Sequence, residues 1–389
     1  MAATVQTPVR EIRVALLGCG QIADAHLSQL KRIRHARVVS VCDVHQDLAW
    51  QAATRFQVPH WDVSIERMLE KTQPDVVHLT TPAHTHAPLA IELLEAGCHV
   101  YVEKPFTLDA AEALEVLAAA KRTGRFVCVG HDQLFDPLWI KAKDWIQKKV
   151  IGEVRHIESV LGYPIDGSFG SQVATNPNHW VRKLPGGLFQ NTISHPLYRI
   201  TDLMQMDQPD IIGGWRRRMD LPFPTELTVQ LQGDRQTGSL MFSTSLPPQR
   251  ITRIFGTRGN LELDSDAQTL TFARRPRLPG ALAKLESPWQ HLGNAAWNLA
   301  HNLRRFAASD IHYFAGMKTL FERFYQAVQQ QAQLPIPHAE AYRVTLLMDR
   351  IFDHCRDAEG HESSFSQSLN DDSSVNRIAA INTRSASRK

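Results

Sequence analysis

The chain has 389 residues, more than one ordinary hydrophobic core organises, so two domains are expected. With 43% hydrophobic and 21% charged residues, its composition excludes a mostly disordered or fibrous protein. The 43 basic and 40 acidic residues give a net charge of +3, which produces no chain-wide field and excludes nucleic acid as the expected main partner.

The cysteine pattern and the hydropathy of the sequence indicate the cellular compartment of the protein. The five cysteines form no CxxC pair and mostly sit inside apolar, strand-like runs, which predicts reduced thiols in a cytoplasmic protein. They are Cys19, Cys42, Cys98, Cys128 and Cys355. No run of about 18 apolar residues occurs and the first residues lack an apolar signal core, so we expect neither a transmembrane segment nor secretion.

Residues 12–129 alternate short apolar runs with helical patterns. The runs are RVALLG, RVVSVCD, PDVVHLTT, GCHVYVEKP and GRFVCVG. Continuous Val, Leu and Ile runs are typical of parallel strands that are covered on both faces. This repeated βα pattern predicts an α/β fold whose first domain, residues 1–130, is a Rossmann domain with a doubly wound parallel sheet.

The pattern changes after Gly130. Runs such as ELTVQLQGD and GSLMFSTS alternate in polarity and are joined by glycine-containing turns, which predicts an antiparallel sheet with one solvated face. Helical patterns at 137–150, 197–206, 313–331 and 339–357 interrupt it. We therefore expect an α+β domain for substrate binding and oligomerisation at 131–358, built on a mainly antiparallel open sheet, and a disordered, serine-rich tail at 359–389.

The stretch LLGCGQIADAHLSQL places Gly18 and Gly20 between a strand pattern and a helix pattern. In a dinucleotide-binding fold the first glycine allows the turn, the second lets the backbone approach the pyrophosphate, and the helix N-terminus favours the negative charge. Asp43 ends the next strand, where its carboxylate can accept bonds from ribose hydroxyls and repel a 2′-phosphate. The motif predicts NAD as the cofactor, held by this turn with its Gln21 and Ile22; His45 leaves NADP possible.

The stretch TTPAHTHAPLAIELLEAGCHVYVEKP, taken with GCGQIA, resembles the glucose-fructose oxidoreductase / inositol dehydrogenase / rhizopine-catabolism family. The resemblance implies that Lys104 lies beside nicotinamide and substrate, and that Thr81, His86 and Glu103 contribute to the cofactor site. His84 and His86 have metal-like spacing, but no carboxylate or cysteine cluster accompanies them, so no metal is expected.

The stretch PGGLFQNTISHPLYRITDLM resembles a second family segment, Gly-Gly-x-x-x-Asp-x-x-x-His. Asn191 and His195 are one helical turn apart and can face the same crevice. The resemblance implies that both act with Lys104 as catalytic and substrate-binding residues. This chain has Asn191 where the family usually has aspartate, and an amide cannot share a proton with the histidine.

Two weaker segments add candidates for substrate binding. HDQLFDP resembles the crossing between the domains, where this chain has Asp132 and Leu134 in place of the frequent asparagine and arginine. In HWVRKLPGG, Trp180, Arg182 and Lys183 are candidates for holding an anionic or polyhydroxylated substrate. An exposed basic turn explains the two cations almost as well.

Residues 274–306 depart from the commonest family plan as an insertion. An amphipathic helix is predicted from apolar residues at three- and four-residue steps, flanked by arginines at the rim. These residues are Trp289, Leu292, Ala296, Leu299, Leu303 and Phe306, with Trp297 expected on the same side. The helix could rest on a membrane surface, bind a partner or second subunit, or cover the substrate pocket; burial against a subunit or the pocket is favoured.

The residues and the resemblance together imply an NAD-dependent dehydrogenase acting on a ring alcohol of a sugar, sugar derivative or cyclitol. His195 would take the hydroxyl proton, while Lys104 would stabilise the alkoxide or join the proton relay. The alternatives are an NAD-dependent glycosidase working by oxidation and elimination, and a non-catalytic dinucleotide-binding regulator. A homo-oligomer through the open sheet of the second domain is expected.

Overall fold

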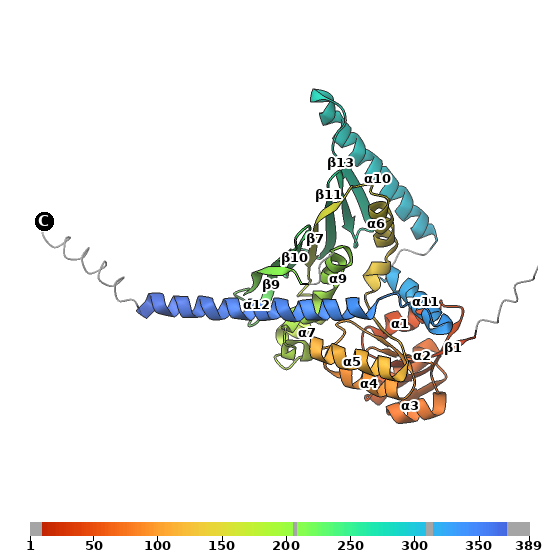
Figure 1. Ribbon diagram of the computed structural model, residues 1–389. Coiled ribbons are helices and arrows are strands. Elements are labelled where there is room, and N and C mark those ends of the chain that lie inside the picture. Colours follow the sequence, from red (N-terminus) through yellow and green to blue (C-terminus); the bar gives the residue numbers. More distant parts are fainter. Residues whose placement is uncertain (1–9, 205–207, 309–313, 372–389) are drawn as a thin grey trace, which may run out of the picture.

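The computed structural model describes residues 10–204, 208–308 and 314–371, with side chains up to residue 359. Two sheets dominate it, each covered by helices (Figure 1). Within these ranges no helix is both long and apolar enough to cross a membrane.

The first sheet is parallel throughout, in the order β3-β2-β1-β4-β5-β6. Its strands are β1 (Ile12–Leu17), β2 (Ala36–Cys42), β3 (His60–Asp62), β4 (Val76–Leu79), β5 (His99–Val102) and β6 (Val127–Val129). The connecting helices are α1 (Ala23–Leu30), α2 (Gln46–Phe56), α3 (Ile65–Thr72), α4 (His86–Glu95) and α5 (Ala110–Thr123). All residues of β4, β5 and β6 are buried, as the continuous apolar runs predicted. The doubly wound Rossmann arrangement is confirmed.

The second sheet is mixed, in the order β13-β12-β11-β7-β10-β9-β8, with β7 and β10 its only parallel pair in the described chain. Its strands are β7 (Val154–Gly162), β8 (Asp210–Arg217), β9 (Pro224–Gln232), β10 (Thr237–Ser243), β11 (Gln249–Gly256), β12 (Gly259–Asp264) and β13 (Thr269–Arg274). Helices α6 (Pro137–Gln147), α7 (Ser168–Thr175), α8 (Gly187–Thr192) and α9 (Ser194–Leu203) precede or interrupt it. Burial alternates along β9, so the mainly antiparallel sheet with one solvated face is confirmed.

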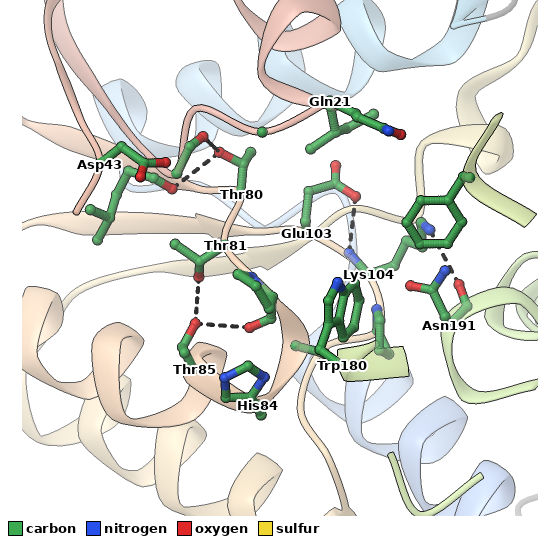
Figure 2. Close-up of a pocket in the computed structure, with 18 of the residues that line it drawn as sticks. Gln21, Asp43, Thr80, Thr81, His84, Thr85, Glu103, Lys104, Trp180 and Asn191 are labelled. Carbon is green, nitrogen blue, oxygen red and sulfur yellow. Dashed lines mark hydrogen bonds between the residues drawn. The ribbon is translucent and has the colours of Figure 1, made fainter. Parts of the chain in front are cut away.

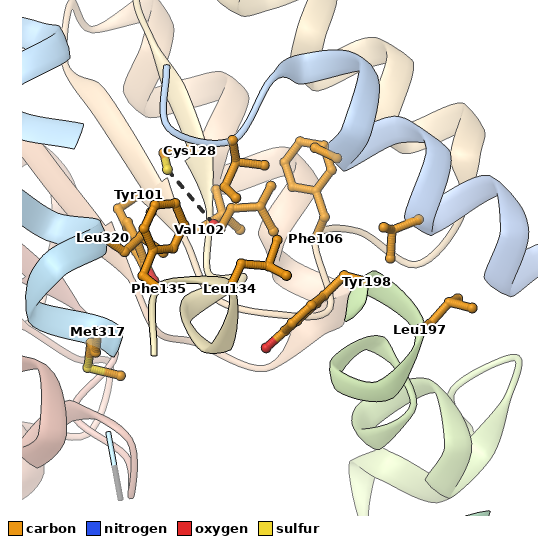
Figure 3. Close-up of a cluster of buried hydrophobic side chains, with 14 of the residues drawn as sticks. Tyr101, Val102, Phe106, Cys128, Leu134, Phe135, Leu197, Tyr198, Met317 and Leu320 are labelled. Carbon is orange, nitrogen blue, oxygen red and sulfur yellow. Dashed lines mark hydrogen bonds between the residues drawn. The ribbon is translucent and has the colours of Figure 1, made fainter. Parts of the chain in front are cut away.

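Three helices close the described chain: α10 (Ala283–Ala307), α11 (Ala315–Gln330) and α12 (His338–Asp371). Helix α11 returns to the first sheet, where the rings of Phe321 and Tyr101 pack edge to face, and Figure 3 shows Met317 and Leu320 joining the same buried cluster. Residues from the predicted second domain thus complete the core of the first. Helix α12 continues to Asp371, so part of the predicted tail is helical; residues 372–389 lie outside the described ranges.

The predicted helix in the 274–306 insertion is confirmed as α10, which lies along the outer edge of the second sheet (Figure 1). Two details of that prediction are wrong. Trp297 lies on the sheet-facing side, stacked on His301 with the Lys141 ammonium 3.4 Å from its ring centre. Arg305 is buried and donates to Gln268, so it does not lie at a solvated rim.

Candidate active site

A cleft of about 920 Å³ is lined by residues from both halves of the chain. Figure 2 shows the ends of the first sheet's strands on one side and Trp180 and Asn191 on the other. Of the residues predicted from the sequence, the cleft brings together Gly18, Gly20, Gln21, Ile22, Asp43, Thr81, Glu103, Lys104, Trp180, Asn191 and His195. A parallel sheet opens onto such a crevice at the carboxyl ends of its strands, which explains the placement of the first eight.

The two glycines of the turn after β1 have different roles. Gly18 has φ of +100°, and a Cβ there would lie 2.7 Å from the Thr81 backbone nitrogen, so the close approach of β4 requires glycine. A Cβ on Gly20 would meet nothing within 4 Å and would point into free space. Ile22, the N-cap of α1, has no polar side chain to satisfy the first-turn N–H groups. The turn therefore fits a dinucleotide pyrophosphate.

Asp43 fixes the same turn from the end of β2. Its Oδ2 accepts a hydrogen bond from the Cys19 N–H at 2.7 Å, and its Oδ1 accepts one from the His45 N–H at 2.8 Å. The side chain is buried yet borders the cleft. Each carboxylate oxygen keeps capacity for a further bond, so Asp43 can hold the turn and receive ribose hydroxyls.

His86 is placed differently from the prediction. Its ring is buried, with Nδ1 2.9 Å from the Pro105 carbonyl oxygen and Nε2 2.9 Å from the Thr81 carbonyl oxygen. Burial lowers the pKa of His86, although the two carbonyls act to raise it. Both ring nitrogens face backbone carbonyls, to one of which the neutral ring donates its single N–H, and His86 is not among the residues that line the cleft. It connects the loop after β4 to the loop that carries Lys104.

Lys104 follows β5 and reaches across the cleft to the second half of the site. Its Nζ donates to the backbone carbonyl of Asn191 at 3.3 Å, as the dashed line in Figure 2 marks. Its backbone N–H donates to Glu103 Oε2 at 3.1 Å. The ammonium group is therefore held at the junction between the two sheets.

Glu103 is anchored from behind by a buried chain of polar side chains. His26 Nε2 lies 2.9 Å from Glu103 Oε1, His26 Nδ1 lies 3.0 Å from His78 Nδ1, and His78 Nε2 lies 2.7 Å from the Tyr325 hydroxyl. The pKa of Glu103 is lowered: burial acts to raise it, but the hydrogen bond from His26 and the charge of Lys104 prevail. Glu103 therefore carries a negative charge beside the cleft.

His195, on α9, is held by Tyr198 one turn later. Its Nδ1 lies 2.9 Å from the Tyr198 hydroxyl, which also accepts a hydrogen bond from the Gln133 N–H at 3.3 Å. Burial lowers the pKa of His195 well below its usual value, and the positive charges of Lys104, Arg250 and Arg199 lower it further. The imidazole is therefore neutral at pH 7, with Nε2 as the ring nitrogen not engaged by Tyr198.

Two further predicted substrate contacts do not line the cleft. Asp132 is buried beneath it, and burial, followed by the charges of Asp136 and Glu103, raises its pKa to about 7. The Arg182 guanidinium lies 4.9 Å from the centre of the Phe223 ring, outside the cleft. Arg182 therefore contacts an aromatic side chain of the protein and not the substrate that the sequence suggested.

The sequence analysis missed Arg250 and Tyr163, which line the cleft from β11 and from the end of β7. Arg250 forms an ion pair with Asp266 at 2.7 Å, and its side chain is largely buried. The alternation of polar and apolar residues along a strand does not indicate which polar residue borders a ligand site. Arg250 and Tyr163 are therefore recognised only in the folded structure. Among the described residues, no group of three or more histidine, cysteine or acidic side chains could hold a metal ion.

Residues 12–131 match the family model described as GFO_IDH_MocA, oxidoreductase family, NAD-binding Rossmann fold. The match confirms the resemblance and the NAD-binding domain over this part of the chain.

Similar proteins with known names share this region. A 4-carboxy-2-hydroxymuconate-6-semialdehyde dehydrogenase of Sphingobium sp. is 31% identical over 140 residues, 36% of this chain and 43% of that protein. Inositol 2-dehydrogenase 4 of Saccharopolyspora erythraea is 33% identical over 145 residues, 37% of this chain and 43% of that protein. The chain thus matches less than half the length of these relatives.

The whole fold has counterparts among solved structures. The WlbA dehydrogenase from Bordetella pertussis, in complex with NADH and UDP-GlcNAcA, superposes with a TM-score of 0.70 over 90% of this chain and 96% of that chain, at 18% identity. This likeness extends to the second domain and shows that both chains share their architecture.

Proposed function

We propose that the chain is an NAD-dependent dehydrogenase, because residues 12–131 match the oxidoreductase family with the NAD-binding Rossmann fold. Its substrate is a ring alcohol of a sugar, a sugar derivative or a cyclitol. The observation that carries the proposal is that Lys104 and His195, 91 positions apart in sequence, border one cleft with the Gly18–Ala23 turn.

In this proposal NAD is the hydride acceptor, and side chains of the protein accept the proton that the alcohol loses. With Nδ1–H donating to the Tyr198 oxygen, His195 Nε2 carries the lone pair that accepts the hydroxyl proton. The Lys104 ammonium stabilises the charge that develops on the alcohol oxygen. The Asn191 amide orients a neighbouring hydroxyl, since it can donate and accept but cannot take the proton.

The second half of the cleft supports a polyhydroxylated or anionic substrate. Lys104 and Arg250 both border it, and their charges lower the pKa of His195 after burial does. Trp180 borders the same space and offers an aromatic face against which a sugar ring can pack. The proposed location is the cytoplasm, because all five cysteines are buried free thiols.

The test follows NADH formation by absorbance with a panel of sugars, sugar acids and cyclitols. The variants Lys104→Met and His195→Ala are each expected to lower turnover by roughly two to four orders of magnitude while NAD binding persists. Lys121→Met and His35→Ala are the matched controls, because both residues are exposed and outside the cleft. Both controls should retain wild-type rates.

Three results would contradict the proposal. Near-normal turnover in both active-site variants would exclude the roles given to Lys104 and His195. Release of the aglycone from a glycoside without net NADH formation would identify a glycosidase acting by oxidation and elimination. Tight NAD binding with no turnover on any substrate of the panel would favour a dinucleotide-binding regulator.

A further inference from the structure

Helix α10 attaches to the second sheet through its polar side. Asn298 Oδ1 accepts from the Leu270 N–H at 3.0 Å, Asn294 Oδ1 from the Phe272 N–H at 3.2 Å, and Gln290 Oε1 from the Arg274 N–H at 3.0 Å. These side chains, spaced four residues apart, bond to alternate backbone groups along the outer edge of β13. The helix therefore satisfies a sheet edge that would otherwise be open to pairing with another strand.

The opposite side of α10 carries an apolar stripe made of Trp289, Leu292, Ala296, Leu299, Leu303 and Phe306. At 100° per residue these positions lie on the side of the helix away from the amide ladder. Trp289 is 71% exposed, Leu299 63% and Phe306 73%. The stripe is thus left uncovered by the described part of the chain, and none of α10 lines the cleft.

The spacing of the stripe identifies what kind of surface covers it. Its steps are 3, 4, 3, 4 and 3 residues, the a/d repeat of a coiled-coil seam, which faces another helix. Its flanks hold the small residues Gly293, Ala295 and Ala300, which let a second helix approach closely. A helix that rests on an anionic membrane carries Lys and Arg along its length beside the apolar face, whereas the exposed Lys284 and Arg304 lie near the two ends of α10, so a helical partner fits better.

We propose that this stripe binds the same stripe of a second copy of the chain, and that the two α10 helices pair antiparallel about a two-fold axis. A two-fold interface uses one self-complementary patch on both copies. In antiparallel register, Trp289 faces the partner's Phe306, Leu292 faces the partner's Leu303, and Ala296 faces the partner's Leu299. Each facing pair then consists of two different apolar side chains. In a parallel pair, Trp289 would face the partner's Trp289 and Ala296 would face the partner's Ala296.

The size of the contact suits a stable dimer. The helix has 25 residues and is about 37 Å long at 1.5 Å per residue. The five large side chains of the stripe are each at least 58% exposed and supply the apolar surface that such a contact would bury; they are Trp289, Leu292, Leu299, Leu303 and Phe306.

The first experiment measures the molar mass of the full chain by sedimentation equilibrium from about 1 to 100 μM. The wild type is expected to be a dimer or an even-numbered oligomer. Leu292→Asp with Leu299→Asp should raise the dissociation constant by at least about 100-fold, because charges enter the centre of the seam. Both residues are exposed in the single chain, so thermal stability at low concentration and NAD binding should not change.

The matched control is Met241→Glu on β10, an exposed apolar residue on the open side of the second sheet. This variant should leave the α10 dimer intact. Loss of association in Met241→Glu but not in the α10 variant would place the interface on the open sheet and overturn the proposal. A monomeric wild type that binds anionic vesicles through α10 would overturn it as well.

A cross-linking experiment tests the orientation. The double variant Leu292→Cys/Leu303→Cys should form a disulfide-linked dimer on mild oxidation, while each single variant should not. The native cysteines are all buried and do not compete. A covalent dimer from Leu292→Cys alone would show parallel pairing, and no covalent dimer in any of the three variants would show that the seam is not the interface.

Discussion

His26 and His78 lie with their Nδ1 atoms 3.0 Å apart, and neither ring has any solvent exposure. Burial lowers the pKa of His78 well below its usual value, so it is neutral. All three hydrogen bonds form when each group donates toward Glu103. The Tyr325 hydroxyl then donates to His78, His78 donates to His26, and His26 donates to the Glu103 carboxylate. Helix α11 thus holds the cleft-side Glu103 through two imidazoles.

Replacing His26 tests that arrangement. His26→Ala removes the partner of a buried carboxylate, so we expect the free energy of unfolding to fall by about 3 kcal/mol. Tyr325→Phe loses only the outermost hydrogen bond and should cost about 1 kcal/mol. Urea denaturation measures both changes in the free energy of unfolding. Adding Glu103→Gln to His26→Ala should recover part of the loss, because the buried charge is gone; equal stability of wild type and His26→Ala would contradict the assignment.

The two glycines of the first turn should respond differently to the same change. Gly20→Val places its side chain in the free space where the pyrophosphate is expected, so NADH binding should be lost at concentrations that saturate the wild type. Its unfolding free energy should stay within about 1 kcal/mol of the wild type. Gly18→Val, which clashes with Thr81, should instead impair folding. Calorimetric titration and thermal melts separate the two effects, and a folded Gly20→Val protein with unchanged affinity would exclude this cofactor site.

Asp43 should select NAD over NADP by its charge. Asp43→Asn keeps the shape and one acceptor for the backbone of the turn but removes the repulsion of a 2′-phosphate. We expect the preference for NADH over NADPH, measured as the ratio of dissociation constants, to fall by at least about tenfold, or about 1.4 kcal/mol. Asp43→Ser should show the same loss together with weaker binding of both cofactors. An unaltered ratio in both variants would show that charge does not set the preference.

Asp132 should make the protein less stable as the pH rises. Burial raises its pKa from 3.8 to about 7, so the unfolded chain releases this proton first. The contribution of Asp132 to stability therefore falls between pH 4 and pH 7, by up to about 4 kcal/mol at 1.36 kcal/mol per pH unit, and does not change above that range.

The variant Asp132→Asn should flatten this part of the stability–pH curve and be more stable than the wild type at pH 8. The exposed Asp47→Asn serves as the control and should follow the wild type. Urea midpoints between pH 4 and pH 8 give the comparison. Parallel curves for Asp132→Asn and the wild type would show that Asp132 is not held protonated.

The sequence alone was sufficient to predict the parallel sheet of the first half of the chain. Buried apolar runs predict parallel strands, and the sequence shows the glycine pair of the turn after β1 directly, although the contact that requires Gly18 is made with Thr81 in the tertiary structure. The carboxyl ends of parallel strands open onto one crevice, which placed Lys104 there, but its association with His195 was implied only by the resemblance to the family. Asn191 lies one helical turn before His195, and the tertiary structure shows that its backbone carbonyl accepts the hydrogen bond from Lys104.

Tertiary packing decided the rest. His86 and Asp132 carry polar groups that the sequence assigned to ligands, and packing turned His86 toward backbone carbonyls and buried Asp132 below the cleft. In α10 the periodicity correctly gave two faces, but which face packs inward depends on the neighbour. The edge of β13 presents unpaired backbone groups, which amide side chains satisfy and leucines cannot, so the polar face turned inward and the apolar face remained exposed.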